Sequence, residues 1–170
     1  MSVTTHLSTL EETRPTRNPR EVVSPELFDR LVDRVRKEYV KVARFYAELM
    51  VEQMLCYLAT AAIYKPENTP GGYFSDGEAF TYLTPSDEVD DALHAFLDLT
   101  AAYRETCHRL TGGRFIDHVP VTNASITSGR SIALTVRTLR EHGWRIDDRM
   151  WVSGASCCSD ICQGRLTTAD

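Results

Sequence analysis

The stretch TPSDEVDDALHAFLDLTAAYRETCHRLTGGRFIDHVP (residues 84–120) predicts one long helix followed by a chain reversal. Thr84 and the acidic residues after it are typical of a helix start, because acidic side chains favour the positive end of the helix dipole. The helical pattern continues to about Leu110, and the pair Gly112-Gly113 ends it. The segment after the glycines can fold back on the helix.

Candidate catalytic side chains lie on both sides of this glycine pair. Asp90 and His94 are four residues apart, so they would share one face of the helix. Asp117 and His118 follow the reversal, where the returning chain can meet that face. An aspartate raises the basicity of a neighbouring imidazole, whose ordinary pKa of about 6.5 suits proton transfer near neutral pH. We therefore predict an acid–base cluster of these four residues.

Three further residues of this stretch are candidates for binding a substrate. Arg114 can hold a carboxylate or another anion through two parallel hydrogen bonds. Thr100 and Tyr103 add hydroxyl groups to the same polar segment. Cys107 could act as a nucleophile only if it were exposed and its pKa were lowered, and nothing in the sequence indicates this. We therefore rank proton transfer by His94 above covalent catalysis by Cys107.

Three other helices are predicted outside this stretch. Ser24 and the proline after it are typical of a helix N-cap and first helical residue. Residues 42–63 are apolar around much of the helical circumference, which predicts the central core helix. Thr127 or Ser128 can cap a further helix, which Gly143 ends.

The fold class expected from these patterns is mainly α. We predict a compact bundle of four or five helices with a long aromatic loop and irregular termini, because strand signals are few. Residues 64–83 form the loop, whose aromatic side chains either build a lid or docking surface or only anchor it to the core. Residues 1–22 are predicted to be a flexible arm, residues 23–151 a helical domain, and residues 152–170 a cysteine-rich tail.

Composition indicates a globular protein that binds neither nucleic acid nor membranes. The chain has 170 residues, of which 42% are hydrophobic and 25% are charged. Its net charge of −5 argues against nucleic acid as a partner. The N-terminus lacks the apolar core of a signal peptide, and no run is long enough to span a membrane. We expect a cytoplasmic protein, in which the five cysteines are thiols, metal ligands or core residues.

A second pattern is spread over the predicted helix and the reversal: Val89, Asp90, His94, Leu97, Thr100, Tyr103, Cys107, Gly113, Arg114, Phe115, Ile116, His118 and Pro120. This pattern resembles a group of bacterial proteins, common in actinobacteria, that are related to the glycine-rich-domain-containing proteins. Their function is largely unassigned, so the resemblance implies a fold, over roughly residues 23–165, and no activity. Leu93 replaces their tryptophan and Asp117 the first of their paired histidines, which favours a specialised member with a changed site or partner.

Metal binding is an alternative use of the same histidines. Imidazole, carboxylate and thiolate are the usual ligands of zinc, and Asp90 could orient His94 as a ligand. Cys107 would lie about 20 Å from His94 along a straight helix, so both could hold one ion only if the helix breaks. His94 and His118 could still meet through the chain reversal. The second candidate metal set consists of His118, Cys157, Cys158 and Cys162. The alternative is a purely structural role, in which His94 is hydrogen-bonded to Asp90 and Cys107 is a core residue.

Two functions from different classes fit these features. The first is a small enzyme without an organic cofactor, or a subunit of a heteromeric enzyme in bacterial specialised metabolism. It would catalyse elimination, cyclisation or hydrolysis on a small molecule, with a second subunit or a second copy as its partner. The alternative is a non-catalytic module that binds a partner protein and contains a structural zinc or a buried His/Cys core. We favour the enzyme, because the polar cluster lies in an otherwise apolar bundle.

Overall fold

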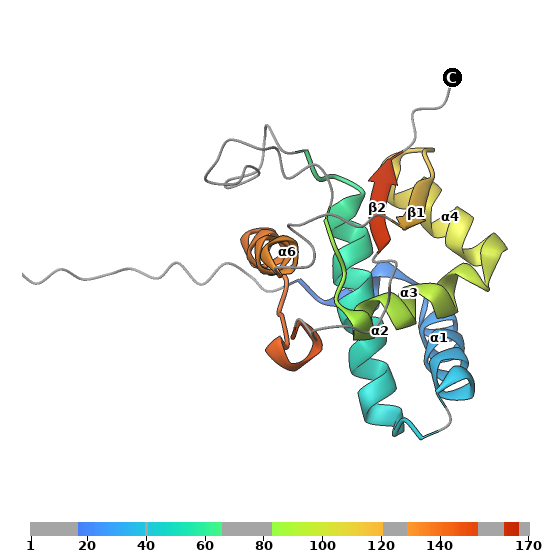
Figure 1. Cartoon of the computed structure of the whole chain (residues 1–170). Coiled ribbons are helices and arrows are strands. Elements are labelled where there is room, and N and C mark those ends of the chain that lie inside the picture. Colours follow the sequence, from blue (N-terminus) through green and yellow to red (C-terminus); the bar gives the residue numbers. More distant parts are fainter. Residues whose placement is uncertain (1–16, 40, 66–82, 121–128, 153–161, 167–170) are drawn as a thin grey trace, which may run out of the picture.

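The computed structural model describes residues 17–39, 41–65, 83–120, 129–152 and 162–166 (Figure 1). This part of the chain contains five α-helices and two short strands. The helices are α1 (Pro25–Glu38), α2 (Arg44–Ala61), α3 (Asp87–Leu97), α4 (Thr100–Thr111) and α6 (Arg130–Glu141). The strands are β1 (Ile116–Pro120) and β2 (Cys162–Leu166). The predicted mainly α bundle of four or five helices is confirmed.

Helix α2 forms the centre of the molecule. Almost every residue from Met50 to Ala61 is buried, as the apolar circumference of the predicted core helix requires. Helices α1 and α3 pack against α2 and against each other, and α6 packs on another side of α2 (Figure 1). The predicted cap of α1 is confirmed, because the Ser24 hydroxyl accepts a hydrogen bond of 3.2 Å from the Leu27 amide.

The prediction of one long helix from Thr84 to Leu110 is wrong, because the chain breaks between α3 and α4. Leu99 leaves the helical conformation, with φ −90° and ψ 52°, and a new helix begins at Thr100. A straight helix over this range would be about 40 Å long, and much of it would extend past the core. The break instead lets both halves bury side chains. Arg34 of α1 pairs with Asp98 at the junction.

The start of α3 also differs from the prediction. The helix begins at Asp87, and Ser86 holds the N-cap position without a side-chain capping bond. The Ser86 hydroxyl instead donates to the carbonyl oxygen of Met150 in the short 3-10 helix η3 (Asp148–Met150). Thr84 and Ser86 are buried, so this entry segment belongs to the core and connects α3 to the segment after α6.

The described structure begins inside the segment that was predicted to be a flexible arm. Residues Pro19–Val22 form the 3-10 helix η1, and Val22 is buried. Arg20 bonds to Glu52 of α2 at 2.6 Å. The guanidinium of Arg17 lies 4.1 Å from the ring centroid of Trp144. Residues 17–22 therefore belong to the helical domain, and the boundary predicted at residue 22 is too late.

Other predictions fall partly or wholly outside the described residues. The further helix is confirmed as α6, although Gly129 and not Thr127 or Ser128 holds its N-cap, and both predicted caps lie outside the described part. Most of the predicted aromatic loop (residues 66–82) and the cysteines at 157 and 158 also lie outside it. None of the described helices is long and apolar enough to cross a membrane.

The C-terminal tail contributes a strand that the sequence did not predict. Strand β2 pairs antiparallel with β1 to form a two-stranded sheet, in which Gly164 lies opposite His118. The chain reversal before β1 is confirmed. Gly112 and Gly113 adopt φ values of 73° and 113°, in the region where glycine avoids the clash of a β-carbon. The reversal directs β1 toward α3.

Candidate metal centre

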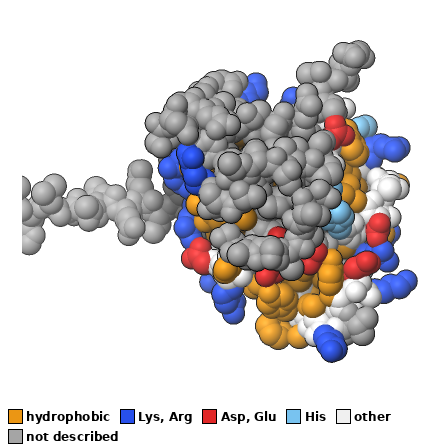
Figure 2. Space-filling view, viewed as in Figure 1, with side chains coloured by type: hydrophobic (Ala, Val, Ile, Leu, Met, Phe, Trp, Pro, Cys, Tyr) orange, Lys and Arg blue, Asp and Glu red, His pale blue; other side chains and the backbone are white. Residues whose placement is uncertain are grey.

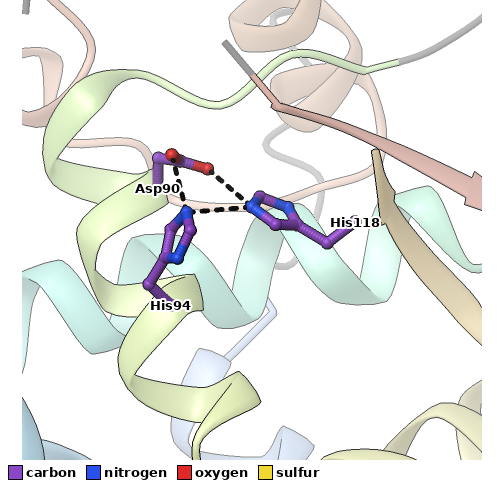
Figure 3. Close-up of side chains that lie close together, drawn as sticks. All are labelled: Asp90, His94 and His118. Atoms are coloured by element: carbon purple, nitrogen blue, oxygen red, sulfur yellow. Dashed lines mark hydrogen bonds and ion pairs between the residues drawn. The ribbon is translucent and has the colours of Figure 1, made fainter. Parts of the chain in front are cut away.

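Three predicted functional side chains meet between α3 and β1. Helix α3 supplies Asp90 and His94, and β1 supplies His118 (Figure 3). The two histidine Nε2 atoms are 3.0 Å apart. The Asp90 carboxylate lies beside both rings, with Oδ2 3.4 Å from Nε2 of His94 and Oδ1 3.6 Å from Nε2 of His118. Residues far apart in the sequence thus place two imidazoles and a carboxylate, three groups that could hold a metal ion, close together.

Local structure explains how each side chain reaches this point. Asp90 and His94 are one helical turn apart, so the predicted shared face is confirmed. His118 comes from the returning chain, and two contacts place that chain. The Tyr103 hydroxyl donates to the Ile116 carbonyl at 2.8 Å, and the Arg114 amide donates to the Thr111 hydroxyl at 2.7 Å. The prediction that the chain folds back to bring His118 to His94 is therefore confirmed.

The cluster is buried on one side and open on the other. The Asp90 and His118 side chains are 14% and 9% exposed, whereas the His94 side chain is 56% exposed. Figure 2 shows histidine and acidic side chains close together on the described surface, with hydrophobic side chains beside them. A small molecule or ion can thus approach from the His94 side, while Asp90 and His118 are held by the protein.

Burial changes the protonation of the two inner residues. It raises the pKa of Asp90 to about 6; the neighbouring His94 opposes this shift, and Asp91 and Asp87 add to it. Burial also lowers the pKa of His118 to about 4, and the charge of His94 acts in the same direction. Near pH 7 Asp90 is therefore a carboxylate and His118 a neutral imidazole. Both are then in the form that binds a cation.

Two polar atoms of the cluster lack a hydrogen-bond partner within the described part of the chain. They are Oδ1 of Asp90 and Nδ1 of His118, and both are buried. Leaving a buried acceptor unpaired costs about 1–3 kcal/mol, so such atoms call for an explanation. A cation between the carboxylate and the imidazoles would satisfy Oδ1 of Asp90.

The spacing of the ligand atoms fits one first-row metal ion. Nitrogen ligands lie about 2.0–2.1 Å from zinc, so two of them at tetrahedral or octahedral angles are roughly 2.9–3.4 Å apart. The observed distance between the two Nε2 atoms is 3.0 Å. Of the carboxylate oxygens, one lies 3.4 Å from Nε2 of His94, at the upper limit of this range, and the other lies 3.6 Å from Nε2 of His118, just above it. Two histidines and one carboxylate are also the ligand set of several catalytic metal sites, which keep a position open for water or substrate.

The other predicted catalytic and substrate-binding residues occupy α4, the chain reversal and β1. Asp117 precedes His118 in β1, and because strand side chains alternate, it points to the other side. Tyr103 is a core residue, since it is 1% exposed and its hydroxyl is bonded to Ile116. Thr100 is exposed in the first turn of α4, and Arg114 is half-buried at the chain reversal. A substrate-binding role for Tyr103 is therefore not supported by its position.

The structure places the cysteines of the predicted sites in different environments. Cys107 is fully buried, and burial raises the pKa of its thiol, so it is a core residue as the structural alternative proposed. The backbone of Cys162 pairs with Pro120 in the β-sheet, whereas Cys157 and Cys158 lie outside the described residues. Of the predicted metal set, His118 alone belongs to the described cluster. Its companions there are Asp90 and His94, and the Asp-x3-His spacing was the sequence signal for them.

Comparison of the chain with protein-family models, curated proteins and solved structures finds no match. The resemblance to proteins related to the glycine-rich-domain-containing group stays a prediction. Function must therefore be inferred from the chemistry of the site itself.

Proposed function

We propose that Asp90, His94 and His118 bind one divalent first-row transition metal, zinc being the first candidate, and that the protein is a small metal-dependent enzyme. The observation that carries this proposal is the convergence of the two Nε2 atoms, 3.0 Å apart, beside one carboxylate. An acid–base pair needs a single histidine beside the carboxylate. A hydrogen bond between the two rings also gives this spacing, and the buried Oδ1 of Asp90 without a hydrogen-bond partner is the observation that favours a shared cation.

The reaction class that this arrangement favours is hydrolysis. When bound, such an ion acts as a Lewis acid and lowers the pKa of a bound water to about 7. Asp90 and His118 would hold the ion from the buried side, and the exposed His94 leaves the opposite side to water and substrate. Of the elimination, cyclisation and hydrolysis reactions expected from the sequence, hydrolysis makes the most direct use of an activated water.

A purely structural zinc fits this ligand set less well. Structural zinc sites are closed by four protein ligands, most often cysteines. Within the described ranges the cluster has three ligands, and one of them is more than half exposed. An open position of this kind is typical of catalytic sites. A second subunit or a second copy that completes the substrate pocket remains part of the proposal.

Metal titration of the full-length chain tests the first half of the proposal. Chelator-treated protein should bind one equivalent of Zn²⁺ or Co²⁺, and the Co²⁺ form should show visible absorption bands. Asp90→Asn, His94→Ala and His118→Gln should each weaken binding by more than about 100-fold, because losing a direct ligand costs more than the 10- to 100-fold of losing an outer-shell partner. His108→Ala is the matched control, because His108 is exposed on α4 outside the cluster. Unchanged binding by His94→Ala and His118→Gln would overturn the metal site.

Activity measurements test the second half. We expect ester or amide hydrolysis by the metal-loaded protein to be lost with a chelator and restored by Zn²⁺ or Co²⁺. Asp90→Asn should abolish it, whereas His108→Ala should leave it unchanged. Turnover that survives chelation but is lost in His94→Ala would instead establish metal-free acid–base catalysis at the same residues.

A further inference from the structure

The strand that carries His118 depends on a segment far away in the sequence. Strand β1 pairs along its whole length with β2, from Ile116 opposite Leu166 to Pro120 opposite Cys162 (Figure 1). His118 lies opposite Gly164, in the middle of this pairing. A two-stranded ribbon is marginally stable by itself in water and needs support from the rest of the molecule.

Strand β2 supplies a connection between β1 and the core. It packs against the central helix α2 as well as pairing with β1. At the start of β1, Ile116 is buried and its carbonyl oxygen accepts the Tyr103 hydroxyl. Two residues further along, the position of His118 is supported by the backbone ladder with β2. Asp90 and His94, by contrast, are held within the turns of α3.

We infer that docking of β2 on β1 holds His118 in the metal centre, so that the C-terminal strand controls metal affinity. This inference rests on the proposed metal site. If β2 detaches, β1 loses its ladder, and His118 can leave the two ligands on α3. Because equilibrium coupling is reciprocal, bound metal must stabilise the docked strand by the same factor by which docking strengthens metal binding.

The coupling has a regulatory consequence. A partner protein that binds β2, or that replaces β2 by adding its own strand to β1, would lower metal affinity without contacting Asp90, His94 or His118. The end of the described chain is therefore a place from which the site can be switched off.

Limited proteolysis of the full-length chain tests the inference from the metal side. Trypsin can cleave after Arg165, inside β2, when this strand is undocked. We expect saturating Zn²⁺ to slow this cleavage about tenfold relative to chelated protein, with a reporter peptide correcting for any effect on the protease. Asp90→Asn should show no protection. Equal cleavage rates with and without Zn²⁺, in wild type that binds Zn²⁺, would overturn the coupling.

A substitution in β2 tests the inference from the strand side. Gly164→Pro removes a backbone donor opposite His118 and should weaken Zn²⁺ binding about tenfold while the helical circular dichroism is retained. Ala169→Pro, beyond the strand, is the control and should bind as wild type does. Failure of the wild type to bind any metal would sink the proposed function. Tight binding by Gly164→Pro would sink the coupling alone, and if that variant does not fold, the proteolysis result decides.

Discussion

The surroundings of Asp90 disfavour the charged form of its carboxylate. This residue is 14% exposed, carries a buried oxygen without a hydrogen bond in the described structure, and has Asp87 and Asp91 as neighbours. Burial and these charges raise its pKa to about 6. Residues that lower stability in this way are common at functional sites, because the strain is relieved when the ligand binds.

Replacing Asp90 with asparagine should therefore stabilise the metal-free protein while it strongly weakens metal binding. Ionised Asp90 costs the folded state stability above pH 6, because the pKa of the group is higher in the folded than in the unfolded chain. In the presence of chelator at pH 7.5, we expect Asp90→Asn to raise the free energy of unfolding by about 2 kcal/mol. The gain should shrink as the pH falls through 6 toward 4. Urea denaturation measures it, and a destabilised Asp90→Asn would contradict the prediction.

His118 should lower the stability of the metal-free protein as the pH falls, whereas Asp90 raises that stability as the pH falls. The pKa of His118 is about 4 in the folded protein, below the ordinary value of about 6.5, so the unfolded chain takes up the proton first. His118 protonation has no effect on the free energy of unfolding above pH 6.5 and lowers this free energy as the pH falls from 6.5 to about 4. In wild type the Asp90 effect offsets this loss. We expect the loss to appear in Asp90→Asn and to vanish in the double variant with His118→Gln, as followed by thermal unfolding in chelator.

Among the elements, the contact between α4 and β1 helps to position the strand that carries His118. The Tyr103 hydroxyl, in the core, donates to Ile116 in the strand. Tyr103 was predicted to bind substrate, because its hydroxyl lies in the polar segment around the candidate catalytic residues. The break at Leu99 instead turns Tyr103 toward β1, where it positions the strand and touches no ligand.

Tyr103→Phe should cost stability and metal affinity together. Removing the hydroxyl leaves the Ile116 carbonyl without its partner, which should lower the free energy of unfolding by about 1–2 kcal/mol. We expect Zn²⁺ binding to weaken several-fold in the same variant. Tyr57→Phe is the matched control, because the buried Tyr57 hydroxyl donates to the Leu83 carbonyl at 3.1 Å and not to the strand that carries His118. Equal metal affinity in the two variants would show that Tyr103 has no positioning role.

At the scale of the whole molecule, one buried amide connects the core helix to the segment after α6. Gln53 of α2 is 2% exposed and donates to the Arg145 carbonyl at 3.3 Å. Its Oε1 atom accepts from the Asp147 amide at 3.2 Å and from Trp151 Nε1 at 2.9 Å. A glutamine on a helix predicts a surface position, so this role could not be read from the sequence.

Gln53→Leu should therefore destabilise the fold strongly and leave metal binding intact in the folded fraction. Three polar groups lose their partner, which should lower the free energy of unfolding by about 3 kcal/mol. Arg20→Ala provides a contrast, because the exposed ion pairs of Arg20 with Glu48 and Glu52 should contribute less than about 1 kcal/mol. Chemical denaturation compares the two variants, and similar losses would contradict the prediction.

The helices and part of the candidate site could be predicted from local patterns of residues. Periodic apolar residues, Ser24 at a helix start and the pair Gly112-Gly113 act locally, so the main helices, the chain reversal and the shared face of Asp90 and His94 could be predicted. These features depend on interactions within a few residues along the chain.

The other features depend on contacts between segments that are far apart in the chain. The break at Leu99 comes from packing both halves on the core, and strand β2 comes from pairing with a partner more than forty residues away. The same long-range contacts bring Nε2 of His118 to 3.0 Å from that of His94 and bury Tyr103 with its hydroxyl on the Ile116 carbonyl. Pairing and packing between distant segments leave no periodic signal in the sequence, which is why the ligand set became visible only in the folded chain.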